Sequence, residues 1–160
     1  MRTAGGRSTR ALAGMTRQSA DSGLDEEQWC AERRTQVAEY LAGAGMTHGD
    51  IGEWPAWHVA PYASVWAIES LKSPGSVGWW VICGDLPTDY VSAADIRHPR
   101  EAVRAIALRW REIVPYLERG ESHPIITIGN PNTFKTLAPL LKARAELLAN
   151  CAEDDTEWPE

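Results

Sequence analysis

The chain has few cysteines, one phenylalanine and no long hydrophobic run among its 160 residues. No apolar segment approaches the roughly 20 residues that a membrane-spanning helix needs, so we expect no contact with a membrane. Cys30, Cys83 and Cys151 are odd in number and far apart, and no two have the spacing of a zinc knuckle or a redox motif. This usage is typical of reduced thiols in the cytoplasm, where each cysteine serves as a small buried hydrophobe.

Clustered positive charge is also missing from the folded part of the sequence. The formal net charge is −6, from 22 acidic and 16 basic residues. Proteins that bind nucleic acids usually carry a basic patch or stripe, because the phosphate backbone dominates their affinity. The composition therefore argues against a nucleic-acid partner.

The familiar catalytic motifs are absent as well. The sequence has no GxSxG nucleophile turn, no GxxxxGK[ST] phosphate loop and no GxGxxG dinucleotide fingerprint, which disfavours an enzyme acting on phosphates or nucleotides. A histidine among carboxylates could bind zinc, iron or manganese, but HxH and HxxxH pairs are lacking and every ligand would come from a loop. The sequence therefore predicts neither a metal site nor a cofactor.

Three regions differ in composition. Residues 1–24 hold four arginines, one acid and many small residues without helical or strand periodicity, which predicts a disordered N-terminal extension. Residues 25–152 are expected to form a single domain. The acidic segment 153–160 is expected to fray as a tail.

The periodicity of the domain predicts three helices and a small sheet. Asp25 is a candidate N-cap for the first helix, and Thr136 for the last. Two β-branched, aromatic runs flank the Pro74–Gly75 turn signal, which favours a hairpin. The second run is apolar on both faces and indicates a central strand. The expected elements are helix 26–41, strands 64–70 and 77–84, helix 99–119, a strand near 124–129, and a helix from 137.

This order favours an α+β fold, with a small, mainly antiparallel sheet packed by the three helices. A three-layer α/β arrangement is the alternative, because the strand near 124–129 follows a long helix and could pair in parallel.

Two segments, GEWPAWHVAPY (52–62) and GDLPTDY (84–90), carry most of the side chains that could perform chemistry. If the hairpin forms, Ser64 and Asp85 lie at the same end of it, so the two segments emerge close together. This geometry predicts one neighbourhood of titratable groups with aromatic walls. The titratable residues of this neighbourhood are Glu53, His58, Asp85, Asp89 and Tyr90, and the aromatic walls are Trp54, Trp57 and Tyr62.

Two functions compete for this neighbourhood. The first is a non-catalytic binding or interaction domain for a small molecule or a protein, with Trp54, Trp57, Tyr62 and Tyr90 as the ligand-binding candidates. The second is a small, hydrolase-like enzyme in which His58 works with Glu53 or Asp85 as acid and base, while Asp85 and Asp89 could pair as catalytic carboxylates. Plainer roles are also open, since the aspartates could cap turns and His58 could bond to a backbone carbonyl.

Residues 26–150 resemble a family of small uncharacterised bacterial proteins known only as a domain of unknown function. The resemblance rests on the runs EEQWC, GEWPAWHVAPY, VWAIES, GWWVICGDLPTDYVSAADIRHPREA and LAPLLKARAELL. It implies a bacterial, cytoplasmic protein, and it carries over no activity, ligand or catalytic residue.

Overall fold

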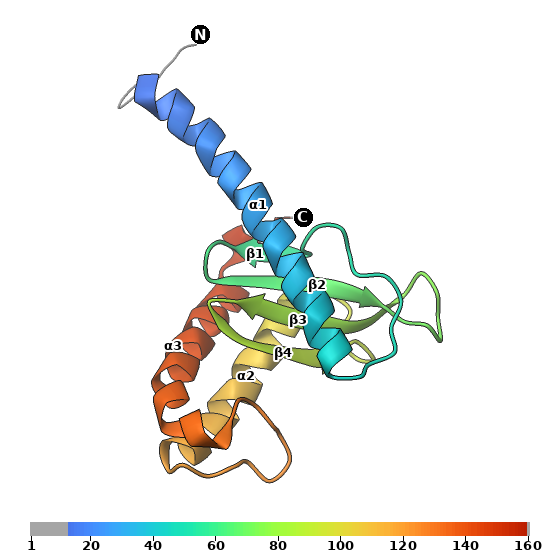
Figure 1. Ribbon diagram of the computed structural model, residues 1–160, viewed down its shortest axis with the longest axis vertical. Helices are drawn as coiled ribbons and strands as arrows, with labels where there is room; N and C mark the ends of the chain where they lie inside the picture. Colours follow the sequence, from blue (N-terminus) through green and yellow to red (C-terminus); the bar gives the residue numbers. More distant parts are fainter. Residues whose placement is uncertain (1–12, 160) are drawn as a thin grey trace.

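A computed structural model describes the backbone of residues 13–159, and the side chains from Asp25 onward. The described part forms three α-helices, four strands and two short 3-10 turns (Figure 1). In chain order these are α1 (Ala13–Gly43), β1 (Trp57–Val59), β2 (Ala63–Glu69), β3 (Val77–Gly84), β4 (Leu86–Ser92), α2 (Pro99–Glu118), η1 (Pro131–Thr133), α3 (Phe134–Glu153) and η2 (Asp155–Glu157).

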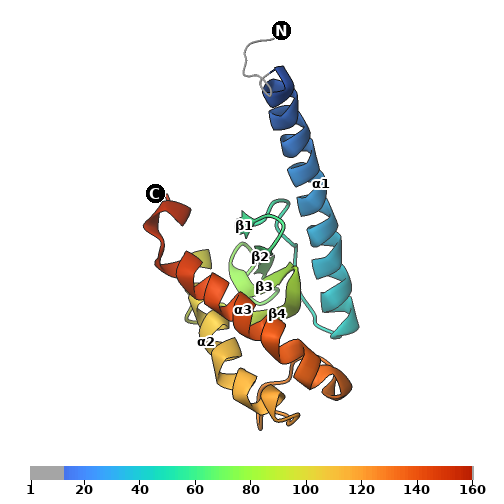
Figure 2. The ribbon, with the colours of Figure 1, turned by 90° about the vertical axis from the view of Figure 1, so that its left-hand side faces the viewer.

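The four strands form one antiparallel sheet in the order β1-β2-β3-β4, each strand pairing with its neighbour in the chain. Helix α1 covers one face of the sheet, and helices α2 and α3 cover the other (Figure 2). The α+β prediction and the hairpin around Pro74–Gly75 are confirmed. The molecule has three layers, but its sheet contains no parallel pair among the described strands, so the α/β alternative is wrong.

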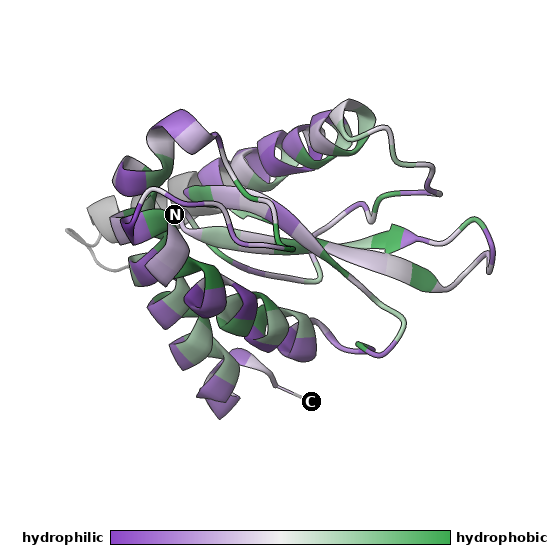
Figure 3. Cartoon of the chain, turned by 90° about the horizontal axis from the view of Figure 1, so that it is seen from below, coloured by the Kyte–Doolittle hydropathy of each residue, from purple (hydrophilic) through white to green (hydrophobic). Residues whose placement is uncertain are grey.

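Strand β3 explains the layering, because its side chains are hydrophobic on both faces. Trp80 and Ile82 join the core beneath α2 and α3, whereas Val81 and Cys83 join a smaller core beneath α1. A strand that is apolar on both faces needs cover on both sides. Figure 3 shows from below that the covering helices carry hydrophilic and hydrophobic residues in turn, as amphipathic helices do.

The predicted strand near 124–129 is wrong, since this segment forms a loop. The Nδ1 atom of His123 accepts hydrogen bonds from the backbone N–H groups of Ile125 and Ile126, at 3.1 and 3.0 Å. In a strand, these N–H groups would be available to pair with a neighbouring strand. The Nε2 of the same ring lies 2.9 Å from Glu112. Ile125 is consequently turned outward and is 86% exposed.

Two helix starts also differ from the sequence prediction. Helix α1 begins at Ala13 and already runs through residues 13–24, the described part of the expected disordered extension; residues 1–12 lie outside the described residues. Asp25 therefore lies inside α1. Helix α3 begins at Phe134, with Thr133 as N-cap residue in place of Thr136, because the buried Phe134 ring anchors the first turn to the core.

The acidic tail is part of the packed structure up to Trp158. This side chain is only 8% exposed and stacks on Trp57, with 5.2 Å between ring centroids. Its Nε1 donates to the carbonyl of Cys151, and Asp154 caps the short η2 turn by accepting from the N–H of Thr156. Composition suggested fraying, but one large aromatic side chain holds the segment in place.

Replacing Trp158 by alanine tests this anchor. Removal of a buried tryptophan leaves a cavity beside Trp57, so Trp158→Ala should lower the free energy of unfolding by about 3 kcal/mol in urea denaturation. Trp54→Ala is the matched control, because Trp54 is 50% exposed; its cost should stay below about 1 kcal/mol. Equal losses in the two variants would contradict the anchoring role.

Candidate functional site

An open cleft of about 630 Å³ lies between α1, the β1–β2 turn and the C-terminal segment. We call it the His58 cleft. It is lined by Asp25, Glu26, Trp29, His58, Val59, Ala60, Pro61 and Glu157. Three of these side chains are carboxylates, and none of the described residues that line the cleft is a lysine or arginine.

His58 is the central side chain of this cleft. It projects from the edge strand β1 toward α1, and its Nε2 lies 2.6 Å from the Oε2 atom of Glu26. Its ring lies between two indoles, with centroids 6.3 Å from Trp29 and 6.0 Å from Trp54. The structure therefore gives His58 a carboxylate partner from α1, rather than Glu53 or Asp85.

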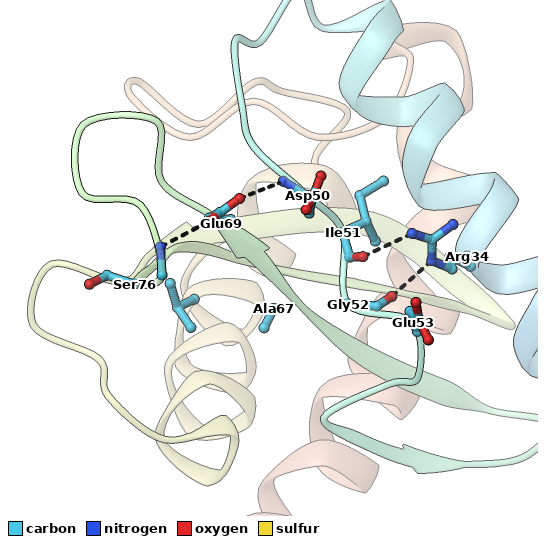
Figure 4. A pocket seen from close by; sticks show the side chains of 10 residues that line it. Arg34, Asp50, Ile51, Gly52, Glu53, Ala67, Glu69 and Ser76 are labelled. Atoms are coloured by element: carbon cyan, nitrogen blue, oxygen red, sulfur yellow. Dashed lines mark hydrogen bonds between the residues drawn. The ribbon is translucent and has the colours of Figure 1, made fainter.

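Glu53 is exposed and lines a different cavity, of about 550 Å³, beside the loop that precedes β1 (Figure 4). Arg34 fastens this loop to α1 by donating to the carbonyls of Ile51 and Gly52, both at 2.9 Å. Glu69 accepts from the backbone N–H groups of Asp50 and Gly75, and these bonds lower the pKa of its carboxyl group. The polar side chains of this cavity thus hold the loops in place.

Trp54 and Trp57 flank Pro55 and have opposite environments. Trp54 is 50% exposed beside His58, whereas Trp57 is 6% exposed and packed on Trp158. The Nε1 of Trp57 donates to Glu157 at 3.3 Å, which positions that carboxylate at the cleft. Trp54 is therefore available to a ligand, and Trp57 supports the wall behind it.

Tyr62 and Asp85 lie together at one end of the hairpin, as the sequence predicted. The N–H of Asp85 donates to the carbonyl of Tyr62, and a Cβ on Gly84 (φ +147°) would overlap that carbonyl, so glycine is required there. Arg144 from α3 bonds to the Asp85 carboxylate at 2.7 Å and covers the Tyr62 ring, 5.1 Å from its centroid. Arg144 therefore contacts both side chains, as an ion pair with Asp85 and as a cation over the ring of Tyr62.

Asp89 and Tyr90 lie on β4, at the opposite edge of the sheet from His58, so the structure separates them from the cleft. Asp89 is 3% exposed, and its Oδ2 accepts from the Nε of Arg109 at 3.0 Å and from the Nε1 of Trp110 at 2.9 Å. It is a structural anion that ties β4 to α2. Tyr90 is on the other face, near Tyr40.

Asp89→Ala should therefore destabilise the protein. The change leaves the buried indole N–H of Trp110 and the Arg109 guanidinium without their acceptor, at a cost of about 2–4 kcal/mol. Urea unfolding measures the effect, and Asp95→Ala, at an exposed aspartate, is the control with an expected change within about 0.5 kcal/mol. A loss below 1 kcal/mol for Asp89→Ala would show that the pair contributes little.

The carboxylate of Asp89 also affects the pKa of Tyr40. Burial, together with the negative charge of Asp89, raises the pKa of Tyr40 to about 12 from its ordinary value of 10.0. Below pH 10 the folded and unfolded chains both keep the proton, while between pH 10 and about 12 only the folded chain does. The stability that Tyr40 contributes is thus complete below pH 10 and is lost as the pH rises toward 12.

An absorbance titration of the phenolate checks this shift. One of the four tyrosines should titrate near pH 12 in the folded protein, and the Tyr40→Phe variant should lack that transition. The variant should also lose less stability than the wild type between pH 10 and 12. A titration curve that is unchanged apart from the loss of a group near pH 10 would assign Tyr40 an ordinary pKa.

The three cysteines offer no nucleophile. All are free, Cys30 and Cys83 are buried, and burial raises the pKa of each of the three thiols. A raised pKa keeps the thiol protonated, and the thiolate is the reactive form. The interpretation of these residues as small hydrophobes is confirmed for the two buried ones.

Sequence reasoning missed the residues that complete the cleft. Glu26 and Trp29 are three residues apart on α1 and so share a face of the helix; the sequence placed both residues within the expected helix 26–41 and gave neither a functional role. Glu157 was assigned to the tail. The only available signal was the three-residue spacing on α1, and it does not say which strand the helix covers.

Among the side chains that the structure describes, from Asp25 to residue 159, no group of three or more histidines, cysteines, aspartates or glutamates is arranged to hold a metal ion. No helix within the described backbone combines the length and the apolar character that crossing a bilayer requires.

The fold and the cleft together define a three-layer α+β domain with an open, acidic and aromatic cleft at one edge of its sheet. The chain belongs to the family described as "Domain of unknown function (DUF4826)", whose model matches residues 24–158. The match includes Trp158, which agrees with its packed position. No curated protein and no solved structure shows significant similarity to the chain.

Proposed function

We propose that the protein is a non-catalytic binding domain and that the His58 cleft binds a cationic group of a small molecule or of a protein partner. The observation that carries the proposal is the lining of the cleft. Three carboxylates, from Asp25, Glu26 and Glu157, line the cleft together with the rings of Trp29 and His58, and the described lining includes no lysine or arginine.

Such a lining suits an ammonium or guanidinium group for two physical reasons. Carboxylates form charge-assisted hydrogen bonds with these donors. Aromatic faces attract a cation through the ring quadrupole, most strongly for tryptophan. The molecule provides its own example, since the guanidinium of Arg33 lies over the ring of Trp29, 5.5 Å from the centroid.

Trp54 extends the proposed binding surface. It is half exposed and meets the ring of His58 edge to face, so a ligand larger than a single cationic group would contact it beyond the cleft. The net charge of −6 would also favour the approach of a positively charged ligand.

Titration with arginine amide, followed by backbone amide NMR, tests the proposal. The shifts should saturate and centre on residues 25–29 and 58–61. Asp25→Asn and Glu26→Gln should each raise the Kd about two- to five-fold, the range expected for exposed ion pairs. Asp95→Asn removes the same charge from an exposed position that does not line the cleft, and it should leave the Kd unchanged.

Equal weakening of binding in all three variants would show that arginine amide responds only to the overall charge, and it would contradict binding in the His58 cleft.

The His58–Glu26 pair at 2.6 Å supports a second candidate, a hydrolase in which these two groups act as acid and base. The same samples distinguish the two functions, because a hydrolase would convert arginine amide to arginine and ammonia, and His58→Gln would stop that conversion.

We also infer that the protein is bacterial and cytoplasmic and that its partner is not a nucleic acid. Three free cysteines support a reducing compartment. The acidic lining of the cleft and the net charge of −6 both disfavour a phosphate backbone as partner.

A further inference from the structure

A second cavity, of about 720 Å³, lies between the β2–β3 turn and the connection from β4 to α2. Its lining differs in kind from that of the His58 cleft. Among the described residues, four serines line it, Ser70, Ser73, Ser76 and Ser92, and the charged lining residues are Lys72 and Arg97. In a chain with a net charge of −6, the described lining of this cavity thus has basic and hydroxyl side chains and no carboxylate.

Two of the four serine hydroxyls, those of Ser70 and Ser92, accept hydrogen bonds from the backbone. The Oγ of Ser70 accepts from the N–H groups of Lys72 and Ser73 at 3.2 and 3.3 Å, and the Oγ of Ser92 accepts from the N–H of Ala94 at 3.1 Å. A hydroxyl has one hydrogen in addition to its two acceptor positions. Because these two oxygens already accept from backbone N–H groups, the hydroxyl hydrogens of Ser70 and Ser92 can be donated to an acceptor in the cavity.

Both walls of the cavity are fixed. The turn is closed by bonds between Ser70 and Ser76 and between Ser76 and Ser73, at 2.9 and 3.0 Å. The opposite wall is held by the indole of Trp80, whose Nε1 donates to the carbonyl of Ile96 at 2.9 Å. A pre-formed set of donors binds a ligand without the entropic cost of ordering a loop.

Asp95 is exposed in the connection from β4 to α2 and does not line the cavity, and two further acidic side chains next to these walls accept from backbone N–H groups. Glu69 accepts from the N–H groups of Asp50 and Gly75, and Glu101 accepts from the N–H of Arg97 at 3.0 Å. Neither lines the cavity. The positive charges of Lys72 and Arg97 are therefore the charges that a ligand in the cavity would meet first.

We infer that this cavity binds an oxyanion, a phosphate or carboxylate group carried by a small molecule. Lysine and arginine supply the charge and serines supply neutral donors, which together match the several acceptor oxygens of such a group. A volume of about 720 Å³ exceeds what a single ion fills and lies in the range of small-molecule sites, so the oxyanion is one end of a larger ligand.

Three parallel NMR titrations of the full chain test the inference, with sodium phosphate, with sodium acetate, and with sodium chloride at matched ionic strength. Phosphate, acetate or both should give saturable amide shifts centred on residues 70–78 and 92–97. A response to phosphate alone assigns the cavity to phosphate groups, and a response to acetate as well extends it to carboxylates. A response to neither, or shifts that chloride reproduces, overturns the inference.

The variants Lys72→Ala and Arg97→Ala should each raise the Kd of the responding anion about tenfold, the effect of losing one charge-assisted hydrogen bond. Lys135→Ala removes the same charge at an exposed position outside the cavity and should leave the Kd unchanged. If all three variants weaken binding equally, the anion responds to general charge and the inference fails. Because these probes are anions, the test of this cavity does not depend on whether arginine amide binds the His58 cleft.

Discussion

Burial of strand β3 on both faces is the constraint on which the rest of the structure depends. Trp80 and Ile82 require a cover on one side, and Val81 and Cys83 require one on the other. Helices on both sides of a small antiparallel sheet satisfy this demand. Because helices cover both faces of the sheet, its open cavities lie along its edges. The His58 cleft forms where the edge strand β1 meets helix α1.

The local elements could be predicted from the sequence, because each rests on a pattern only a few residues long. The hairpin and α2 followed from β-branched runs, a Pro-Gly turn and a helical stripe. The partners of the candidate site residues could not be predicted in this way. His58 meets Glu26 across 32 residues and Asp85 meets Arg144 across 59, and both contacts exist only after a helix has docked on the sheet.

The errors have the same origin. The segment HPIITIG has strand composition, yet the ring of His123 satisfies two of its backbone N–H groups locally, which removes the need for a neighbouring strand. The tail has the composition of a frayed end, yet one stacking contact between Trp158 and Trp57 orders it. In both places the contacts of a single side chain decide the local structure. Composition averages over a whole segment and therefore does not reveal such a contact.

The two cavities proposed to bind ligands lie at opposite ends of strand β2. The His58 cleft adjoins the turn before Ala63, and the serine-lined cavity adjoins the turn after Glu69. Seven residues of extended strand separate them by roughly 20 Å. At that distance, about twice the Debye length at moderate salt, the acidic lining of one and the basic lining of the other are screened from each other. The two proposed ligands, a cation in the His58 cleft and an anion in the serine-lined cavity, would therefore bind independently of each other.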